Sequence, residues 1–153
     1  MKLESSAFRD GQPIPQQYSR DGEDTSPPLS WSDVPPGTKS LTLICDDPDA
    51  PRGTWVHWVY YDLPPSLTSL PPGVRKADRP GPGGVQGLND YKETGWGGPQ
   101  PPKGHGVHRY SFRLSALDRE LGLSPGATKA EVESAMQGHL LGEAKLTGTY
   151  RRD

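Results

Sequence analysis

The sequence has very little cysteine and no long apolar run. Its single cysteine, Cys45, excludes an internal disulfide framework and a zinc site built from several cysteines. No apolar run approaches the ~20 residues of a membrane-spanning helix, and residues 1–5 hold no apolar stretch typical of a signal peptide. With 17 basic and 19 acidic residues, the chain also lacks the basic excess of a nucleic-acid-binding protein. We therefore expect a cytoplasmic protein with no membrane span and no nucleic-acid partner.

Apolar residues are also scarce, at 31% of the chain, and the mean hydropathy is -0.78. Together with 19 glycines and 18 prolines, this composition leans toward disorder. The net charge of -2 argues against disorder, because disordered chains usually carry a strong charge imbalance. The apolar residues are moreover gathered in short blocks, such as 41–45 and 55–61. The 153 residues are therefore expected to form one folded domain, 1–153, with a modest core and many ordered loops.

The arrangement of these blocks predicts a mainly β domain. Turn residues bound four segments that we interpret as strands: 39–45, 54–62, 107–115 and 145–151. Alternation in the second segment predicts one face that carries Trp55, His57, Val59 and Tyr61. Alternation in the third predicts a face that carries His108, Tyr110, Phe112 and Leu114. Both faces of the second strand are bulky, so this strand should be central and covered on both sides.

One late helix is predicted after the third strand. Thr128 and Glu131 have the spacing of a capping box, and apolar residues follow at helical spacing until Gly142, where we expect the helix to end. The first forty residues are polar and are expected to form loops. Residues 63–106 are rich in proline and glycine and lack periodicity, and a loop of this length is usually functional or disordered.

An acidic loop and two histidines are the main candidates for chemistry. Asp46, Asp47 and Asp49 lie between the first two predicted strands, and His57 and His108 lie within strands expected in the core. Each has an ordinary structural interpretation, because Asp is common in turns and a buried histidine is often a structural hydrogen-bonding residue. Their combination favours a site, because neighbouring strands are only ~4.8 Å apart and side chains on a shared face can converge.

The two remaining histidines are weaker candidates. His105 lies in a glycine-rich loop and is expected to be solvated. His139 lies on the apolar stripe of the predicted helix and is expected in the core.

These candidate residues resemble the signatures of the phosphatidylethanolamine-binding protein family, which includes the Raf kinase inhibitor protein and prokaryotic relatives. The main motifs are Asp47-Pro48-Asp49-Ala50-Pro51, Trp55-Val56-His57, Pro101-Pro102-Lys103-Gly104 and Gly106-Val107-His108-Arg109-Tyr110. Further matches lie at 26–31, 135–139 and 146–151, so the resemblance covers nearly the full chain. The ending is similar to that of the short prokaryotic branch.

The resemblance implies a large antiparallel sheet packed on a smaller sheet, with helix on one side, and a pocket for a small anion. Carried over by position, the ligand-binding residues would be Asp47, Ala50, Pro51, Trp55, His57, Gly98, Pro101, His108 and Tyr110. It also implies a cis peptide bond between Ala50 and Pro51. Two positions depart from the prokaryotic pattern, because Asp24 replaces a usual asparagine and Trp96 a usual tyrosine.

Electrostatics suggests how a carboxylate could serve such an anion pocket. Asp47 beside an imidazole should favour the charged ring and raise its pKa, which leaves one imidazolium N–H for the ligand. The amides of Gly97 and Gly98 are expected to add donors, and Trp55 and Pro101 to form apolar walls. Such a pocket would suit phosphate, a phosphate monoester or a carboxylate.

Three functions are open on this reading of the sequence. The first is a small-anion binding module without a cofactor that regulates a partner kinase or protease, as the resemblance implies. The second is a hydrolase that uses Asp47, His57 and His108 as acid, base and orienting group, although the sequence places no nucleophile near them. The third is a metal-dependent site built from the same three residues. A homodimer is also left open.

Overall fold

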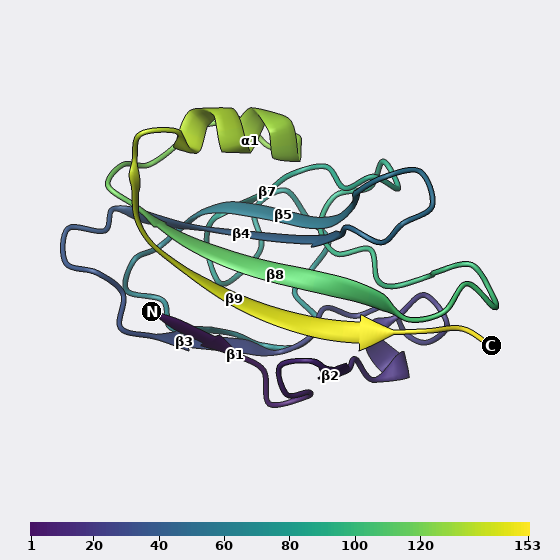
Figure 1. Ribbon diagram of the computed structural model, residues 1–153. Helices are drawn as coiled ribbons and strands as arrows, with labels where there is room; N and C mark the ends of the chain where they lie inside the picture. Colours follow the sequence, from purple (N-terminus) through teal and green to yellow (C-terminus); the bar gives the residue numbers. More distant parts are fainter.

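The computed structural model describes residues 1–153, which form two β-sheets and one α-helix (Figure 1). The small sheet has the strand order β1-β3-β6 and the large sheet the order β2-β9-β8-β4-β5-β7. In chain order the elements are β1 Lys2–Glu4, β2 Gln12–Pro13, the 3-10 helix Gln16–Tyr18, β3 Leu29–Ser32, β4 Ser40–Asp47, β5 Trp55–Leu63, β6 Ser69–Leu70, β7 Val85–Gln86, β8 His108–Leu117, α1 Lys129–Met136 and β9 Leu140–Tyr150. None of the helices has both the length and the apolar character needed to cross a bilayer.

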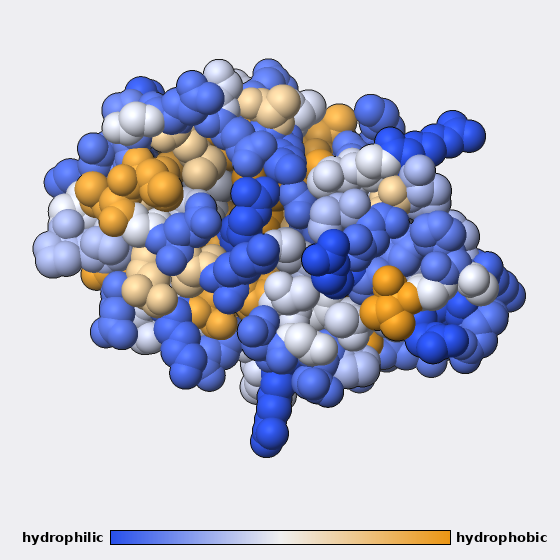
Figure 2. All heavy atoms as spheres, viewed as in Figure 1, coloured by the Kyte–Doolittle hydropathy of each residue, from blue (hydrophilic) through white to orange (hydrophobic).

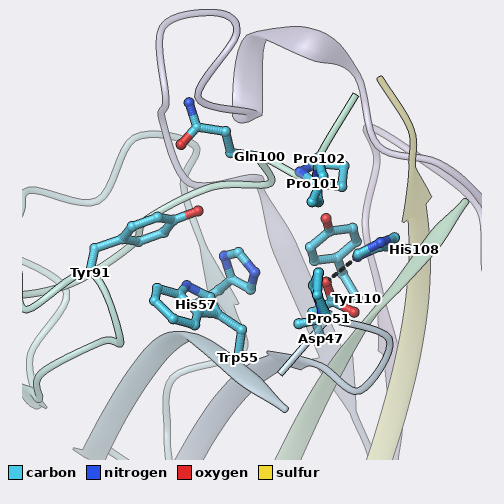
Figure 3. Close-up of a pocket in the computed structure, with 11 residues that line it drawn as sticks. Asp47, Pro51, Trp55, His57, Tyr91, Gln100, Pro101, Pro102, His108 and Tyr110 are labelled. Carbon is cyan, nitrogen blue, oxygen red and sulfur yellow. Dashed lines mark hydrogen bonds and ion pairs between the residues drawn. The ribbon is translucent and has the colours of Figure 1, made fainter. Parts of the chain in front are cut away.

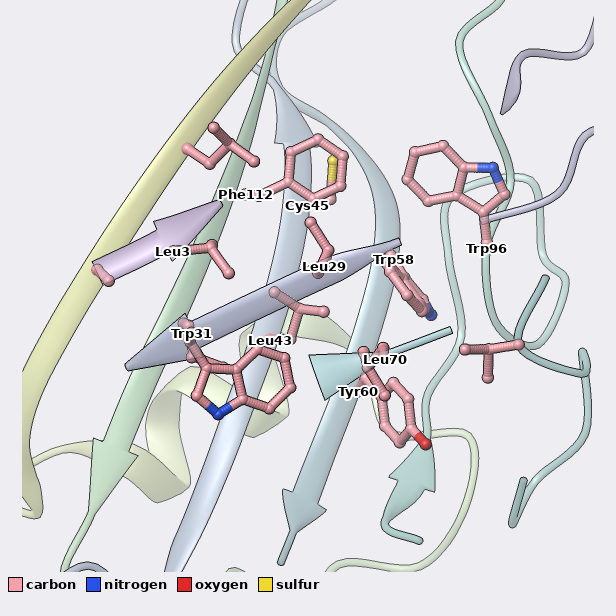
Figure 4. Packing of buried hydrophobic residues seen from close by; sticks show 14 of the residues in the cluster. Leu3, Leu29, Trp31, Leu43, Cys45, Trp58, Tyr60, Leu70, Trp96 and Phe112 are labelled. Carbon is pink, nitrogen blue, oxygen red and sulfur yellow. The ribbon is translucent and has the colours of Figure 1, made fainter. Parts of the chain in front are cut away.

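The large sheet is a middle layer, with α1 on one face and the small sheet on the other (Figure 1). Its neighbouring strands are antiparallel except β2 and β9, which run parallel. A buried cluster of 21 residues lies between the sheets, and Figure 4 shows Phe112 and Leu43 of the large sheet near Leu3 and Trp31 of the small one. A second cluster, of 9 residues, lies beneath α1. The expected fold, a large sheet on a smaller sheet with one late helix, is confirmed.

Most of the scarce apolar residues lie in these two clusters. Only four large apolar side chains are exposed: Trp55, Val107, Leu140 and Leu141. On the face shown in Figure 2, apolar atoms form small separate groups within a mainly hydrophilic surface. A chain of low mean hydropathy can therefore build a dry core because it leaves little apolar surface outside it.

The beginning of the chain is not the loop that we expected. β1 and β3 pair with each other in the small sheet, with Leu3 opposite Trp31. Both side chains are only 5% exposed. The strands have three and four residues, which is too short for alternation to reveal them in the sequence.

The helix begins as predicted but ends earlier. The hydroxyl of Thr128 accepts the amide of Glu131, and the Glu131 carboxylate accepts the amide of Thr128, so the capping box is confirmed. The helix ends at Met136 and not at Gly142. Gly138, with φ of 83°, turns the chain, and the residues that follow pair with β8 instead of continuing the helix.

A β-bulge in β5 changes the direction of His57. The register of β4 and β5 runs from Cys45↔Trp58 to Asp46↔Val56. His57 is therefore an extra residue on its strand, and bulges of this kind re-aim side chains. The predicted face is wrong for His57: Val59 packs beneath α1, whereas the His57 ring lies 5.1 Å from that of Tyr110, in the cluster between the sheets. The bulge thus places His57 on the same side of the sheet as His108.

The core position of Leu114 gives a direct test of this packing. Leu114 is 0% exposed between the two sheets, so Leu114→Ala should lower the free energy of unfolding, measured in urea, by about 2–5 kcal/mol. Leu140→Ala is the matched control, because Leu140 is 53% exposed, and should change it by less than about 0.5 kcal/mol. Equal losses in the two variants would contradict the placement of β8.

Candidate functional site

A cavity of about 210 Å³ opens where β4, β5 and β8 meet two loops (Figure 3). Its lining residues are Asp47, Ala50, Pro51, Trp55, His57, Tyr91, Gln100, Pro101, Pro102, His108 and Tyr110. Aromatic and proline residues make up most of this lining, and its polar side chains are those of Asp47, His57, Tyr91, Gln100, His108 and Tyr110. Ligand pockets commonly have this composition.

The cavity brings together eight of the nine residues expected to bind a ligand. The exception is Gly98, which does not line it. Sequence reasoning missed three lining residues: Tyr91, Gln100 and Pro102. Gln100 and Pro102 flank the expected Pro101. Tyr91 lies in the long loop, and no motif marks it; its ring centroid lies 5.4 Å from that of Trp55. That these residues bind a ligand stays a prediction.

A chain of three hydrogen-bonded side chains runs beside the cavity. Oδ2 of Asp47 lies 2.6 Å from Nδ1 of His108, and Nε2 of His108 lies 2.6 Å from Nδ1 of His105. The side chains of His108 and Asp47 are only 2% and 4% exposed. Because both nitrogens of His108 are engaged, this imidazole has no free donor for a ligand. His105 is exposed, as expected, but its contact with His108 was not predicted.

His57 does not have the environment that we expected. Its Nδ1 lies 2.6 Å from the carbonyl oxygen of Gly97, and a carbonyl can only accept, so Nδ1 carries the proton. Burial lowers the pKa of His57, and this effect exceeds the opposite influence of the Gly97 carbonyl and of Asp47. The expectation of a raised pKa is therefore wrong for His57, because Asp47 pairs with His108 instead. His57 is left with an unprotonated Nε2.

The glycine amides expected to bind an anion are already used within the chain. The amide of Gly97 donates to the carbonyl of His57 at 3.0 Å, and the amide of Gly98 donates to Oδ1 of Asp24 at 2.7 Å. This expectation is wrong because the segment is tied to its neighbours through those amides. Asp24 has a φ of 57°, which aspartate and asparagine tolerate better than most residues, so the aspartate can take the place of the usual asparagine.

The acidic loop closes without a cis peptide bond. No cis bond is present, so the expectation for Ala50-Pro51 is wrong. A trans bond is the commoner state before proline, and other contacts shape this loop. Oδ1 of Asp47 accepts the amide of Asp49 at 2.8 Å, and the amide of Gly53 donates to the carbonyl of Ala50 at 3.1 Å.

Asp49 ties this loop to β8 and does not face the cavity. Its carboxylate accepts the amide of Arg109 at 2.9 Å and the guanidinium at 2.8 and 2.9 Å. These hydrogen bonds lower the pKa of Asp49 to about 2. Asp49 is thus charged at neutral pH and has a structural role. This agrees with the interpretation that aspartates of the acidic loop stabilise a turn.

Two phenols complete the polar groups of the cavity. Burial raises the pKa of Tyr91 to about 12 and also raises that of Tyr110, so both hydroxyls keep their protons. The Tyr91 hydroxyl donates to the carbonyl of Gly98 at 2.9 Å. The Tyr110 hydroxyl makes no hydrogen bond within the chain and lies below Pro101 in Figure 3. The Tyr110 phenol and Nε2 of His57 therefore have no partner in the chain, and the same holds for the exposed Gln100 amide and the Trp55 indole N–H.

The other candidate residues lie away from this arrangement. No group of three or more His, Cys, Asp or Glu side chains is arranged to hold a metal ion. Cys45 is buried, and burial, with Asp46 and Asp47 nearby, raises the pKa of its thiol. His139 lies outside the helix, not in the core, and its Nδ1 pairs with Asp118 at 2.7 Å.

Comparison with known proteins identifies the family. The family profile described as Phosphatidylethanolamine-binding protein matches residues 4–151. A UPF0098 protein of Methanothermobacter thermautotrophicus is 56% identical over 152 residues, which span 99% of each chain. Among solved structures, a putative PEBP homologue of Chlamydia trachomatis has a TM-score of 0.90 at 44% identity, with 99% of this chain and 97% of that one covered.

A second solved structure supports the same conclusion. E. coli YbcL, described as a new member of the mammalian PEBP family, has a TM-score of 0.91 at 32% identity, and the match covers 99% of this chain and 98% of that one. The likeness thus extends over the whole fold and includes every strand that forms the cavity. The chain belongs to the phosphatidylethanolamine-binding protein family.

Proposed function

We propose that the protein is a binding module whose cavity takes a small oxyanion, either a phosphate monoester or a carboxylate. The observation that carries this proposal is the free hydroxyl of Tyr110 beside the free Nε2 of His57, inside an apolar wall. Neither atom has a partner in the chain, so both can form a hydrogen bond with a ligand in the cavity. The family name supports a phosphate-bearing ligand, since a phosphatidylethanolamine headgroup contains a phosphate.

The charges around the cavity decide the protonation state of the complex. No lysine or arginine lines the cavity, and the Asp47 carboxylate faces His108. The neutral Nε2 of His57 would repel an oxyanion unless a proton lies between them. This proton can be taken up by His57 from solution, or the ligand can bring it in its protonated form. The bound complex contains the same number of protons in both cases. We therefore propose that the protein takes up one proton when it binds a fully ionised ligand.

Regulation of a partner extends this proposal on the strength of the family resemblance. The resemblance to the Raf kinase inhibitor protein favours a kinase or a protease as the partner, and ligand occupancy would control that contact. Cytoplasmic location and a homodimer also stay proposals.

Binding is favoured over catalysis because a reacting group is missing. Asp47, His57 and His108 could move protons, but hydrolysis also needs a nucleophile or an activated water. Cys45 cannot supply one, because it is completely buried and its thiol pKa is raised by burial. The metal-dependent alternative is disfavoured, because the Asp47–His108 contact engages the two groups with each other.

The first prediction concerns the free phenol. Tyr110→Phe removes a hydrogen bond to a charged ligand, so the affinity for O-phosphoethanolamine, measured by calorimetry, should fall about 10- to 100-fold. Tyr61→Phe is the matched control, because its hydroxyl bonds the Ser124 carbonyl on the helix side of the sheet, and should leave affinity unchanged. Unchanged affinity in Tyr110→Phe would contradict the proposed binding mode.

The second prediction concerns pH. His57 has a lowered pKa and is neutral at pH 7, and an anion prefers the protonated ring, so affinity should rise as pH falls. Acetate is the best probe, because a simple carboxylate is ionised throughout the range from about pH 6 to 8.5 and only the protein titrates. His57→Gln should show weak binding without this pH dependence. Constant acetate affinity in the wild-type protein would contradict the role of His57.

The third prediction is that the purified protein shows no turnover in a panel of phosphatase, esterase and peptidase assays, with or without added zinc. The physical reason is the lack of an accessible nucleophile described above. Turnover that disappears in His57→Gln or His108→Gln would overturn the binding-module proposal. Activity that survives in both variants would come from a contaminant and would leave the prediction standing.

A further inference from the structure

The contact between His105 and His108 joins two imidazole rings, so its existence depends on how many protons the pair carries. Nδ1 of His105 and Nε2 of His108 are 2.6 Å apart. The carboxylate of Asp47 accepts at Nδ1 of His108, so that nitrogen carries a proton in every state of the pair. The contact with His105 therefore involves only the second nitrogen of His108.

Counting protons shows when this contact can exist. With both rings neutral, Nδ1–H of His105 donates to Nε2 of His108. With one added proton, His108 becomes an imidazolium and donates to an unprotonated Nδ1 of His105, so the bond persists. With two added protons, two N–H groups and two positive charges face each other, and no hydrogen bond can form. The bond is thus present with zero or one charge and lost with two.

The neighbouring charges compensate the first added proton but not the second. The titratable and charged groups around the pair come from the cavity and from the end of the chain. They are Asp47, Asp49, His57, Arg109 and Tyr110 on the first side, and Asp21, Lys103, Tyr150, Arg152 and Asp153 on the second. Asp47 stabilises a charge on His108, at 2.6 Å. Asp49 is already engaged by the Arg109 guanidinium. Asp21 is bonded to Arg152 and Tyr150, and Asp153 is paired with Arg151, so no other carboxylate among these groups is free to stabilise a charge on His105.

The bond holds a loop that forms one wall of the cavity. His105 belongs to the segment 101–106, whose first two residues, Pro101 and Pro102, line the cavity. Apart from the histidine pair, the segment is tied to the rest of the chain through Arg152, whose carbonyl accepts the Gly104 amide at 2.8 Å and whose guanidinium reaches the Pro101 carbonyl at 3.5 Å. Few contacts hold this segment, so losing one matters.

We propose that His105 and His108 form an acid-released latch, which fixes the segment 101–106 against the buried Asp47–His108 pair at neutral pH and frees it when both imidazoles are protonated. Freeing the segment would open the wall that Pro101 and Pro102 provide. We therefore expect faster ligand exchange in acid. This expectation rests on the proposed anion-binding function, whereas the latch itself does not.

The latch can be tested without any ligand. Backbone 15N relaxation of Gly104, His105 and Gly106, compared at about pH 7.5 and at about pH 4.5, should report an ordered segment at the first value and a flexible one at the second. In His105→Ala the segment should be flexible at both pH values. In His105→Gln the side-chain amide does not titrate: its NH2 can donate to Nε2 of His108, and its oxygen can accept from Nε2–H once that nitrogen is protonated, so the segment should stay ordered at both pH values.

His139→Gln is the matched control, because His139 is bonded to Asp118 and has no contact with the segment, and it should behave as wild type. A wild-type segment whose order does not change with pH would overturn the latch. Release in acid with the same midpoint in wild type, His105→Gln and His105→Ala would also overturn it. A second measurement, the dissociation rate of O-phosphoethanolamine in wild type and His105→Ala, tests the consequence: no binding in either protein would refute the proposed function while the relaxation data still decide on the latch.

Discussion

The buried carboxylate of Asp47 is the interaction on which the site depends. A carboxylate that is 4% exposed is costly unless it is paired and hydrogen-bonded. Asp47 meets this requirement by joining the last residue of β4 to His108, at the start of β8, and to the amide of Asp49 in the following loop. Three separate parts of the chain therefore meet at one charge. The loop conformation, the tautomer of His108 and the position of His105 all follow from it.

The same interaction explains why the cavity offers so few free groups. A site for an oxyanion could use imidazolium and amide donors, but His108 faces Asp47, and the amides of Gly97 and Gly98 face His57 and Asp24. The donors that stabilise the fold are not available to a ligand. Apart from the exposed Gln100 amide and the Trp55 indole N–H, what is left is the phenol of Tyr110 and the unprotonated Nε2 of His57. The preference that we propose, for an oxyanion that shares a proton with His57, rests on this shortage and not on an excess of positive charge.

The sequence predicted the parts of the fold that depend on periodicity. Strands with eight or more residues were found near their observed positions, because alternation over that length is distinctive. The resemblance implied the small sheet, but periodicity located neither its strands nor the two-residue strands, since pairing between distant segments decides them. The early end of α1 at Met136 was missed for the same reason, because the pairing of β9 with β8 overrides an apolar stripe at helical spacing.

The site was predictable in its residues but not in its hydrogen bonds. Family motifs located Asp47, His57 and His108, and the cavity brings them together. A single bulge decided the direction of His57, and no pattern in the sequence marks a one-residue offset between two strands. The partner of Asp47, the carbonyl bonded by His57 and the role of His105 depend on which groups lie within 3 Å. Spacing in the sequence does not contain that information.

The segment that crosses the site, residues 96–106, is held more firmly at one end than at the other, and this difference follows from the layers of the fold. One end of the segment that crosses the site is anchored at Trp96, which is 1% exposed, stacks on Phe112 and donates to the Tyr18 carbonyl at 3.0 Å. That end belongs to the core between the sheets. The other end passes Pro102 and reaches β8 through an exposed loop, where His105 makes the contact nearest to the cavity. Motion at the site should therefore begin at the histidine end, because the tryptophan end can move only if the core is disrupted.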